Sequence, residues 1–219
     1  MISKTKLEEI CNKFANNKND CLLFIEIYNF LLLNPEFASR VKDKKKIETS
    51  DWFEKTARKF YESKYKNFIP STPGTVPDSM VDSILNLYYG YDLKKLKIMQ
   101  IEHQHSMAAE NAVGEFIELY LDSILSKHGW IRCCGQIVSK TDFIKKIGSS
   151  YKMLQVKSRD NTENSSSSSV REGTEIMKWF RYFAKTGKKN WDKFPDENAK
   201  QELSEDGFIN FVKNYAKHI

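Results

Sequence analysis

Asp142, Gln155 and Lys157 have the residue types and the order that metal-assisted hydrolysis of a phosphodiester needs. That reaction requires charge neutralisation on the scissile phosphate and an activated water, and a divalent metal held by oxygen ligands supplies both. We expect Asp142 to be the principal Mg²⁺ ligand, with the side-chain amide of Gln155 and the backbone carbonyl of Val156 as further ligands. Residues i and i+2 of a strand share a face, so Lys157 would project beside Gln155 and orient or deprotonate the attacking water.

The stretch before these residues adds carboxylates at helical spacing. Glu110, Gly114 and Glu118 are four residues apart and would lie on one face of a helix. Gly114 would let that face approach another backbone closely, so Glu118 or Glu110 is expected to reach the same centre and hold a second metal or its waters. Glu115 lies about 100° around the helix from Gly114 and is a weaker candidate. The alternative for each glutamate is a solvated charge on a helix surface.

A polar tract follows Lys157 directly and ends in five serines. Arginine suits guanine in the major groove, asparagine suits adenine, and serine hydroxyls bind phosphates. We therefore expect the tract to contact DNA, which would couple recognition of the base sequence directly to cleavage. The alternative is a solvated loop with Ser169 as a helix cap. The residues assigned to DNA contact, including basic residues farther along the chain, are Ser158, Arg159, Asp160, Asn161, Glu163, Asn164, Ser165, Ser166, Ser167, Arg171, Lys178 and Arg181.

Helices and short strands are expected around these residues in the second half of the chain. Apolar residues at helical spacing predict a helix over 106–125, which Gly129 ends. Runs rich in β-formers predict three strands, with a turn at 145–150 between the last two. These runs are 130–138, 142–144 and 151–157.

The end of the chain is expected to be helical. The sequence Ser169-Val170-Arg171-Glu172 fits a capping box and predicts a helix with Ile176, Trp179, Phe180 and Phe183 on its buried side. A loop follows, and a last helix begins at about Ser204.

The first half reads as helices joined by loops. Helical spacing predicts one or two helices over 3–33, with a break at 16–20 that Asp20 could cap, and an amphipathic helix over 51–66. Three of the five prolines fall in 69–78 and predict a loop, after which a further helical stripe ends at Gly90.

Two other motifs compete for the chemistry. Pro77-Asp78 with Asp92-Leu93-Lys94 fits a Pro-Asp … acidic-x-Lys nuclease pattern, but residues 79–89 carry a helical stripe where that pattern needs a β-hairpin. Pro77-Asp78 therefore more simply caps a helix. His103-Gln104-His105 could suggest a metal site, yet no matching partner spacing follows, so a polar segment leading into a helix is the better account.

Several blocks of the second half resemble the SinI-type type II restriction endonucleases over roughly residues 105–195. The blocks are Ala108 to Gly114, Glu118-x-Tyr120, His128-Gly129-Trp130, Asp142-Phe143-Ile144, Leu154 to Ser168, Arg171-x-Gly173-Thr174 and Lys178 to Arg181. The arrangement also looks like the PD-(D/E)XK nuclease core, with two departures. Thr141 stands where that core has proline, and Gln155 stands where it has an acidic residue.

The resemblance implies Mg²⁺-dependent cleavage of double-stranded DNA within GGWCC (W being A or T) by a homodimer, as part of a restriction-modification system. The products would carry 5′-phosphate and 3′-hydroxyl ends. By position, Asp142, Gln155 and Lys157 inherit the catalytic roles, and Glu118 inherits a further one.

The composition is compatible with this reading. A hydrophobic fraction of 40% over 219 residues indicates a globular protein. The net charge of +6 suits a polyanionic partner or a solvated lysine-rich surface. The longest apolar stretch, 21–33, is too short for a bilayer, which needs about 20 apolar residues, and the N-terminus lacks a signal core. No Cys-x-x-Cys occurs, so reduced thiols in a bacterial cytoplasmic protein best explain Cys11, Cys21, Cys133 and Cys134.

The expected fold is α/β (α+β), with a PD-(D/E)XK restriction-endonuclease-like core in which helices flank a small mixed sheet. Residues 1–100 would form a helical region for DNA contact or dimerisation, and residues 101–219 the nuclease core with its recognition segment. Neither a membrane nor a nucleotide cofactor is expected. Two alternatives remain: a non-catalytic or modification-dependent DNA-binding protein in which Gln155 marks a weakened metal site, and an all-helical interaction protein, which strand content would exclude.

Overall fold

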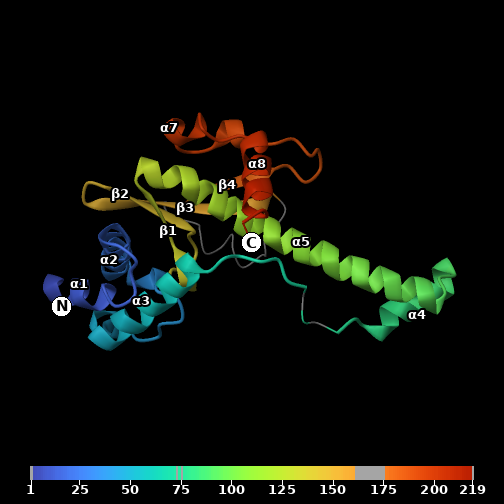
Figure 1. Cartoon of the computed structure of the whole chain (residues 1–219), viewed down its shortest axis with the longest axis horizontal. Coiled ribbons are helices and arrows are strands. Elements are labelled where there is room, and N and C mark those ends of the chain that lie inside the picture. The colour runs from blue at the N-terminus through green and yellow to red at the C-terminus, as the bar shows by residue number, and fades with distance from the viewer. Residues whose placement is uncertain (1, 73, 75, 161–175, 219) are drawn as a thin grey trace.

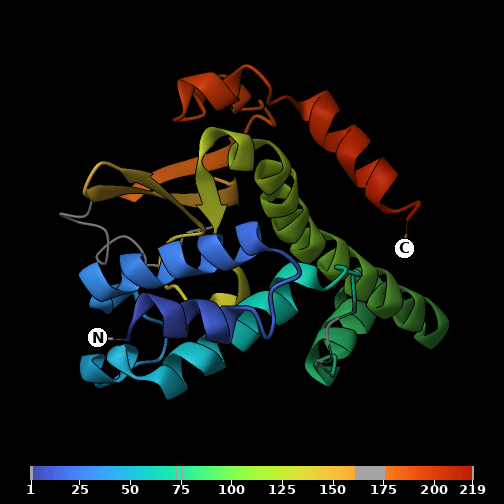
Figure 2. The same cartoon turned by 60° about the vertical axis from the view of Figure 1, so that its left-hand side comes forward.

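A four-stranded mixed sheet lies between two helical layers (Figures 1 and 2). The structure, a computed structural model, describes residues 2–72, 74, 76–160 and 176–218. The strands are antiparallel from β1 to β3, and β4 runs parallel to β3 at the edge. Their bounds are β1 (Trp130–Arg132), β2 (Phe143–Ile147), β3 (Ser150–Arg159) and β4 (Ile176–Tyr182). The sheet confirms the expected fold class and excludes an all-helical protein.

Three N-terminal helices cover one face of the sheet. Residues such as Phe24 and Phe60 form one apolar cluster with Ile144 and Met153 of the strands. The helices are α1 (Lys4–Cys11), α2 (Lys18–Leu33) and α3 (Ser50–Tyr65), as the sequence predicted. The cap of α2 was predicted wrongly: Asn17 accepts the hydrogen bond from the Asp20 N–H at 2.9 Å.

Helix α5 (Leu93–Leu125) covers the opposite face. Its residues Ile117 and Leu121 pack with Phe143 and Leu154, which alternate along the strands with the residues that face α1 to α3. Outside it lie the short α7 (Glu197–Lys200) and α8 (Glu205–Tyr215). Ser204 caps α8 by accepting from the Gly207 N–H at 3.0 Å, which confirms the predicted start of the last helix.

The predicted start of α5 was wrong. The helix is 33 residues long and begins at Leu93, because Asp92 caps it by accepting from the Lys95 N–H at 2.8 Å. Residues 103–105 therefore lie inside the helix instead of leading into it. The division between residues 100 and 101 falls within α5 and stays a prediction.

The two aspartates of the competing nuclease motif, Asp78 and Asp92, are both helix caps. Asp78 accepts from the Met80 N–H at 2.9 Å and caps α4 (Ser79–Tyr89), and Asp92 caps α5. Gly90, with φ of 68°, ends α4 in the left-handed conformation. No β-hairpin joins Asp78 to Asp92, so this motif is excluded as a nuclease centre.

Three predictions about the region around the sheet needed correction. Residues 133–138 leave the strand and form a 3₁₀ turn at Cys134–Gln136. Strand β2 continues to Ile147, and the turn shrinks to 148–149. Residues 176–182 form β4 instead of a helix, because their β-forming side chains pair with the free edge of β3. The predicted capping box at 169–172 lies outside the described residues.

All four cysteines are free thiols, as expected. Within the part of the chain that the structure describes, no helix is both long and apolar enough to cross a membrane.

Gly135 couples α3 to the sheet, and its replacement should destabilise the fold. Its φ is +76°, and an added Cβ would lie 2.6 Å from the Lys59 carbonyl oxygen. We expect Gly135→Ala to lower the free energy of unfolding by roughly 3 kcal/mol, from left-handed strain plus the clash. Gly148→Ala, with φ of +60° and open space around it, is the matched control and should cost about 1 kcal/mol. Urea denaturation measures both, and equal losses would contradict the packing argument.

Candidate active site

Asp142 directly precedes β2 and lies at the end of the β2–β3 hairpin that is opposite its turn; we call this end the Asp142 corner. Its N–H donates to the Leu154 carbonyl at 2.9 Å, and its carbonyl accepts from the Cys133 N–H at 2.8 Å. Its side-chain Oδ2 accepts from the Val156 N–H at 2.7 Å. These bonds fix the carboxylate against the part of β3 that carries Gln155 and Lys157, as predicted from the order of these residues.

Thr141 holds the backbone at this corner. Its buried hydroxyl lies 3.0 Å from the carbonyl oxygens of both Phe143 and Leu154. The proline expected here from the PD-(D/E)XK pattern would fix φ but offer no such donor. Threonine therefore ties the start of β2 to β3 by a side-chain hydrogen bond.

Glu118 comes from α5 to the same corner. Burial raises its pKa to about 7, and the nearby Asp142 carboxylate adds to this, while Arg132 opposes the rise. Burial also raises the pKa of Asp142, against the Val156 N–H, Lys157 and Arg132. The two partly buried carboxylates therefore lie close enough to repel each other, and a divalent cation would relieve that repulsion.

Arg132, at the end of β1, supports Glu118. Its side chain is 9% exposed, and its Nε lies 3.3 Å from Glu118 Oε2, while its terminal nitrogen pairs with Glu115. The weaker candidate Glu115 therefore contributes by holding Arg132. Arg132 was not predicted as a site residue; the available signal was an arginine ending a strand that otherwise contributes buried Trp130 and Ile131.

Gln155 and Lys157 lie on one face of β3, both half-buried. In the parallel pairing with β4, Gln155 is opposite Lys178 and Lys157 is opposite Phe180. Partial burial and the neighbouring Lys157 lower the pKa of Lys178. Lys178, predicted to contact DNA, is thus placed beside the lysine of the catalytic motif.

Glu110 lies apart from the Asp142 corner. It is eight residues from Glu118, about 12 Å along the helix, and its exposed carboxylate pairs with Arg159 at 2.9 Å. Arg159 ends β3, and its guanidinium also lies over the Tyr182 ring at 5.8 Å. The structure therefore brings Glu118, and not Glu110, beside Asp142. The expected close backbone approach at Gly114 is wrong, since nothing lies within 4 Å of a Cβ there.

Three of the remaining residues assigned to DNA contact lie in the described part of the chain. Asp160 accepts from the Ala184 N–H at 2.9 Å, which ties the end of β3 to the chain after β4. Arg181 pairs with Glu205 of α8 and packs over the Phe208 ring, while Ser158 is half-buried in β3. Lying outside the described residues are Asn161, Glu163, Asn164, Ser165, Ser166, Ser167 and Arg171.

Comparison with known proteins shows the family of the chain. The SinI restriction endonuclease family matches residues 7–218. The chain is 39% identical over 226 residues to the type II restriction enzyme Eco47I of Escherichia coli, with 98% of each chain covered. It is also 39% identical over 219 residues to the type II restriction enzyme SinI of Salmonella infantis, covering 97% of this chain and 95% of that enzyme. The chain belongs to the SinI restriction endonuclease family.

Family membership confirms the resemblance seen in the second half and extends it over the N-terminal helices. The family is one of type II restriction endonucleases, so site-specific cleavage of DNA in a restriction-modification system is the activity that membership assigns. Phosphodiester hydrolysis is the chemistry for which Asp142 and Lys157 were selected from the sequence.

The side chains at the Asp142 corner suit a hard divalent cation. Asp142 and Glu118 supply carboxylate oxygens, and Gln155 supplies an amide oxygen, with no thiolate or imidazole required. In the described part of the chain, no group of three or more His, Cys, Asp or Glu side chains is placed to hold a metal. A cation here would therefore rely on two carboxylates, with the amide, backbone carbonyls, water or substrate completing its shell.

Glu118 should make stability depend on pH in the metal-free protein. With its folded-state pKa near 7, against an ordinary value of 4.5, the folded chain holds a proton that the unfolded chain releases. The free energy of unfolding should therefore fall as pH rises from about 5 to 8. Glu118→Gln should make this fall shallower, and Glu110→Gln on the exposed part of α5 is the matched control. Urea denaturation across that range measures both, and an unchanged slope in Glu118→Gln would contradict the assignment.

Proposed function

We propose that the chain is a Mg²⁺-dependent type II restriction endonuclease that acts as a homodimer and cuts double-stranded DNA within GGWCC. The products would carry 5′-phosphate and 3′-hydroxyl ends. The observation that carries the proposal is the meeting of Asp142, Glu118 and Lys157 at one corner of the sheet, in a chain of this family.

Each residue has a distinct role in the proposed reaction. Asp142 and Glu118 would hold Mg²⁺, with Gln155 and the Val156 carbonyl as further ligands. The metal, when bound, offsets charge on the scissile phosphate and acidifies water. Lys157 would orient the attacking water and stabilise the developing negative charge.

Basic residues next to this corner support a DNA substrate. Lys178 lies beside Lys157, and Arg159 ends the same strand, so positive charge continues along β3 and β4 from the proposed metal site. Phosphates are neutralised by such side chains, while base edges are read by arginine and asparagine in the major groove. We assign the reading to the tract that begins at Ser158, together with Lys178 and Arg181.

Removing the charge of Asp142 should abolish cutting. Asp142→Asn keeps an acceptor for the Val156 N–H but loses the anionic ligand, so the cleavage rate should fall by about 10²-fold or more. Wild type with plasmid and Mg²⁺ should give discrete bands, and EDTA should remove them. DNA binding by Asp142→Asn, followed by gel shift, should survive.

The control for that experiment is Asp92→Asn, in the competing motif. Asparagine also caps helices well, so this variant should cut like wild type. Loss of activity in Asp92→Asn together with full activity in Asp142→Asn would contradict the assignment of the site to Asp142. No cutting by wild type would instead favour the non-catalytic DNA-binding alternative, which Gln155 in place of an acidic residue keeps open.

The recognition site is tested separately. Digestion of a sequenced plasmid, followed by run-off sequencing of the ends, should place every cut within GGWCC on both strands. Discrete cuts at another short sequence would reject GGWCC and leave the endonuclease activity standing. A smear would reject site-specific cleavage.

A further inference from the structure

Helix α4 and the first half of α5 form an arm that projects from the body (Figures 1 and 2). We define the arm as residues 76–107. Helix α4 has no buried residue, and Leu96 is the one buried residue of α5 before Ala108. A short helix held to the first half of α5 by one buried leucine is marginal by itself, since helices in proteins are stabilised mainly by packing of their apolar faces.

The arm exposes many large apolar side chains. Their exposed fractions run from 37% at Met107 to 92% at Val76, with Leu87 at 78% and Tyr88 at 81%. Side chains of this size expose on the order of 100 Å² each, so together they offer about 1,000 Å², against about 800 Å² per partner in a standard interface. The members are Val76, Met80, Val81, Ile84, Leu87, Tyr88, Tyr89, Leu93, Ile98, Ile101 and Met107.

Monomeric proteins seldom expose contiguous apolar patches above a few hundred Å². An arm of this kind therefore requires a partner.

The charge of the arm selects the class of partner. The chain as a whole carries +6, but residues 76–107 hold three lysines against four carboxylates. Phosphate binding requires an excess of basic residues, so DNA does not match this surface. A protein surface that is itself apolar and mixed in charge does match it, and the arm of a second copy has both properties.

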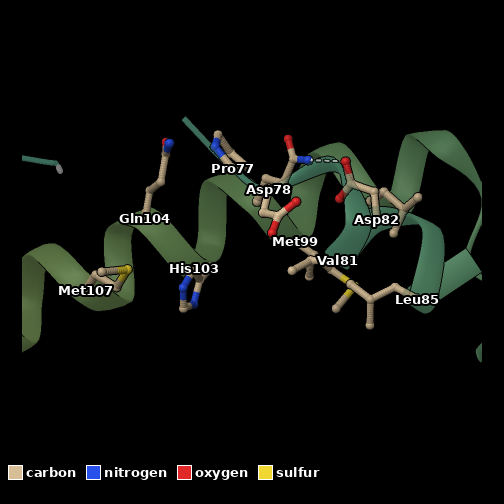
Figure 3. A pocket seen from close by; sticks show the side chains of 11 residues that line it. Pro77, Asp78, Val81, Asp82, Leu85, Met99, His103, Gln104 and Met107 are labelled. Carbon is tan, nitrogen blue, oxygen red and sulfur yellow. Dashed lines mark hydrogen bonds between the residues drawn. The ribbon is translucent and has the colours of Figure 1, made fainter. Parts of the chain in front are cut away.

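An apolar groove between the two helices gives the partner a place to dock. Figure 3 shows Val81 and Leu85 of α4 facing Met99 of α5, while Gln100 donates to Asp82 at 2.7 Å across the groove. The groove has a volume of about 350 Å³, and Leu96 also lines it. This space suits one large apolar side chain.

We propose that two copies of this chain pair through their arms in a two-fold dimer. The same apolar patch on each copy would be buried, with Leu87 and Tyr88 in the interface. The choice of a second copy rests on the proposed function, since a near-palindromic target asks for two sites related by a two-fold axis. The pairing would then set the distance between the two Asp142 corners.

The test is the mass of the full chain in solution. In sedimentation velocity at micromolar concentration, wild type should have about twice the mass of 25.6 kDa. The double variant Leu87→Glu/Tyr88→Glu should be monomeric, its dimer at least about tenfold weaker, because four buried charges would oppose association. The matched control is Leu33→Glu, which changes a leucine that is 66% exposed at the end of α2 and should leave the dimer intact.

Two results would overturn the inference: a monomeric wild type, or a double variant that dimerises as tightly as wild type. If the double variant fails to fold by circular dichroism, hydrogen exchange on wild type decides. Protection of residues 79–101 that falls on dilution supports pairing through the arms, and its absence rejects it. DNA cleavage is assayed in parallel. A wild type that dimerises without cutting DNA rejects the proposed function alone, and one that cuts as a monomer rejects the arm.

Discussion

The hydrogen bond from the Val156 N–H to the Asp142 carboxylate holds the candidate site together. It joins the first residue before β2 to the strand that carries Lys157, and Thr141 reinforces the same corner through the Leu154 carbonyl. The two helical layers leave this corner half-buried, and the lowered polarity strengthens each polar contact. The site therefore depends on the antiparallel pairing of β2 with β3 more than on any loop.

Charge balance is the second constraint on this corner. Asp142 and Glu118 repel each other, and burial raises the pKa of both. Arg132 is itself buried, and it keeps Glu118 directed at the site by pairing with that residue and with Glu115. A half-buried carboxylate pair whose pKa values stay raised despite Arg132 and Lys157 is incompletely compensated, which is the electrostatic condition in which a divalent cation binds well.

The residues of this corner could be predicted from the sequence because the main ones lie close together along the chain. Asp142 and Lys157 lie on neighbouring strands of one hairpin, so residue types and spacing were enough to place them together. Arg132 was missed since its role arises only when β1 packs beside α5. Strand β4 was missed for a related reason: Trp179 and Phe180 suit a helix as well as a strand until the free edge of β3 is available to pair with them. The early start of α5 was missed because polar and charged residues alternate with the apolar ones over 93–105.

The same electrostatics give a reason for a glutamine, instead of an acidic residue, at position 155. The PD-(D/E)XK pattern places an acidic residue there, which would bring a third carboxylate close to Asp142 and Glu118. The cations nearby are Arg132, already shared by two glutamates, and the lysines at 157 and 178. A third carboxylate would raise the pKa values of the other two further and favour their protonated forms near neutral pH. An amide supplies a ligand oxygen without that penalty. In the proposed site, Gln155 therefore binds the metal more weakly than a carboxylate would, but it favours the ionised forms of Asp142 and Glu118.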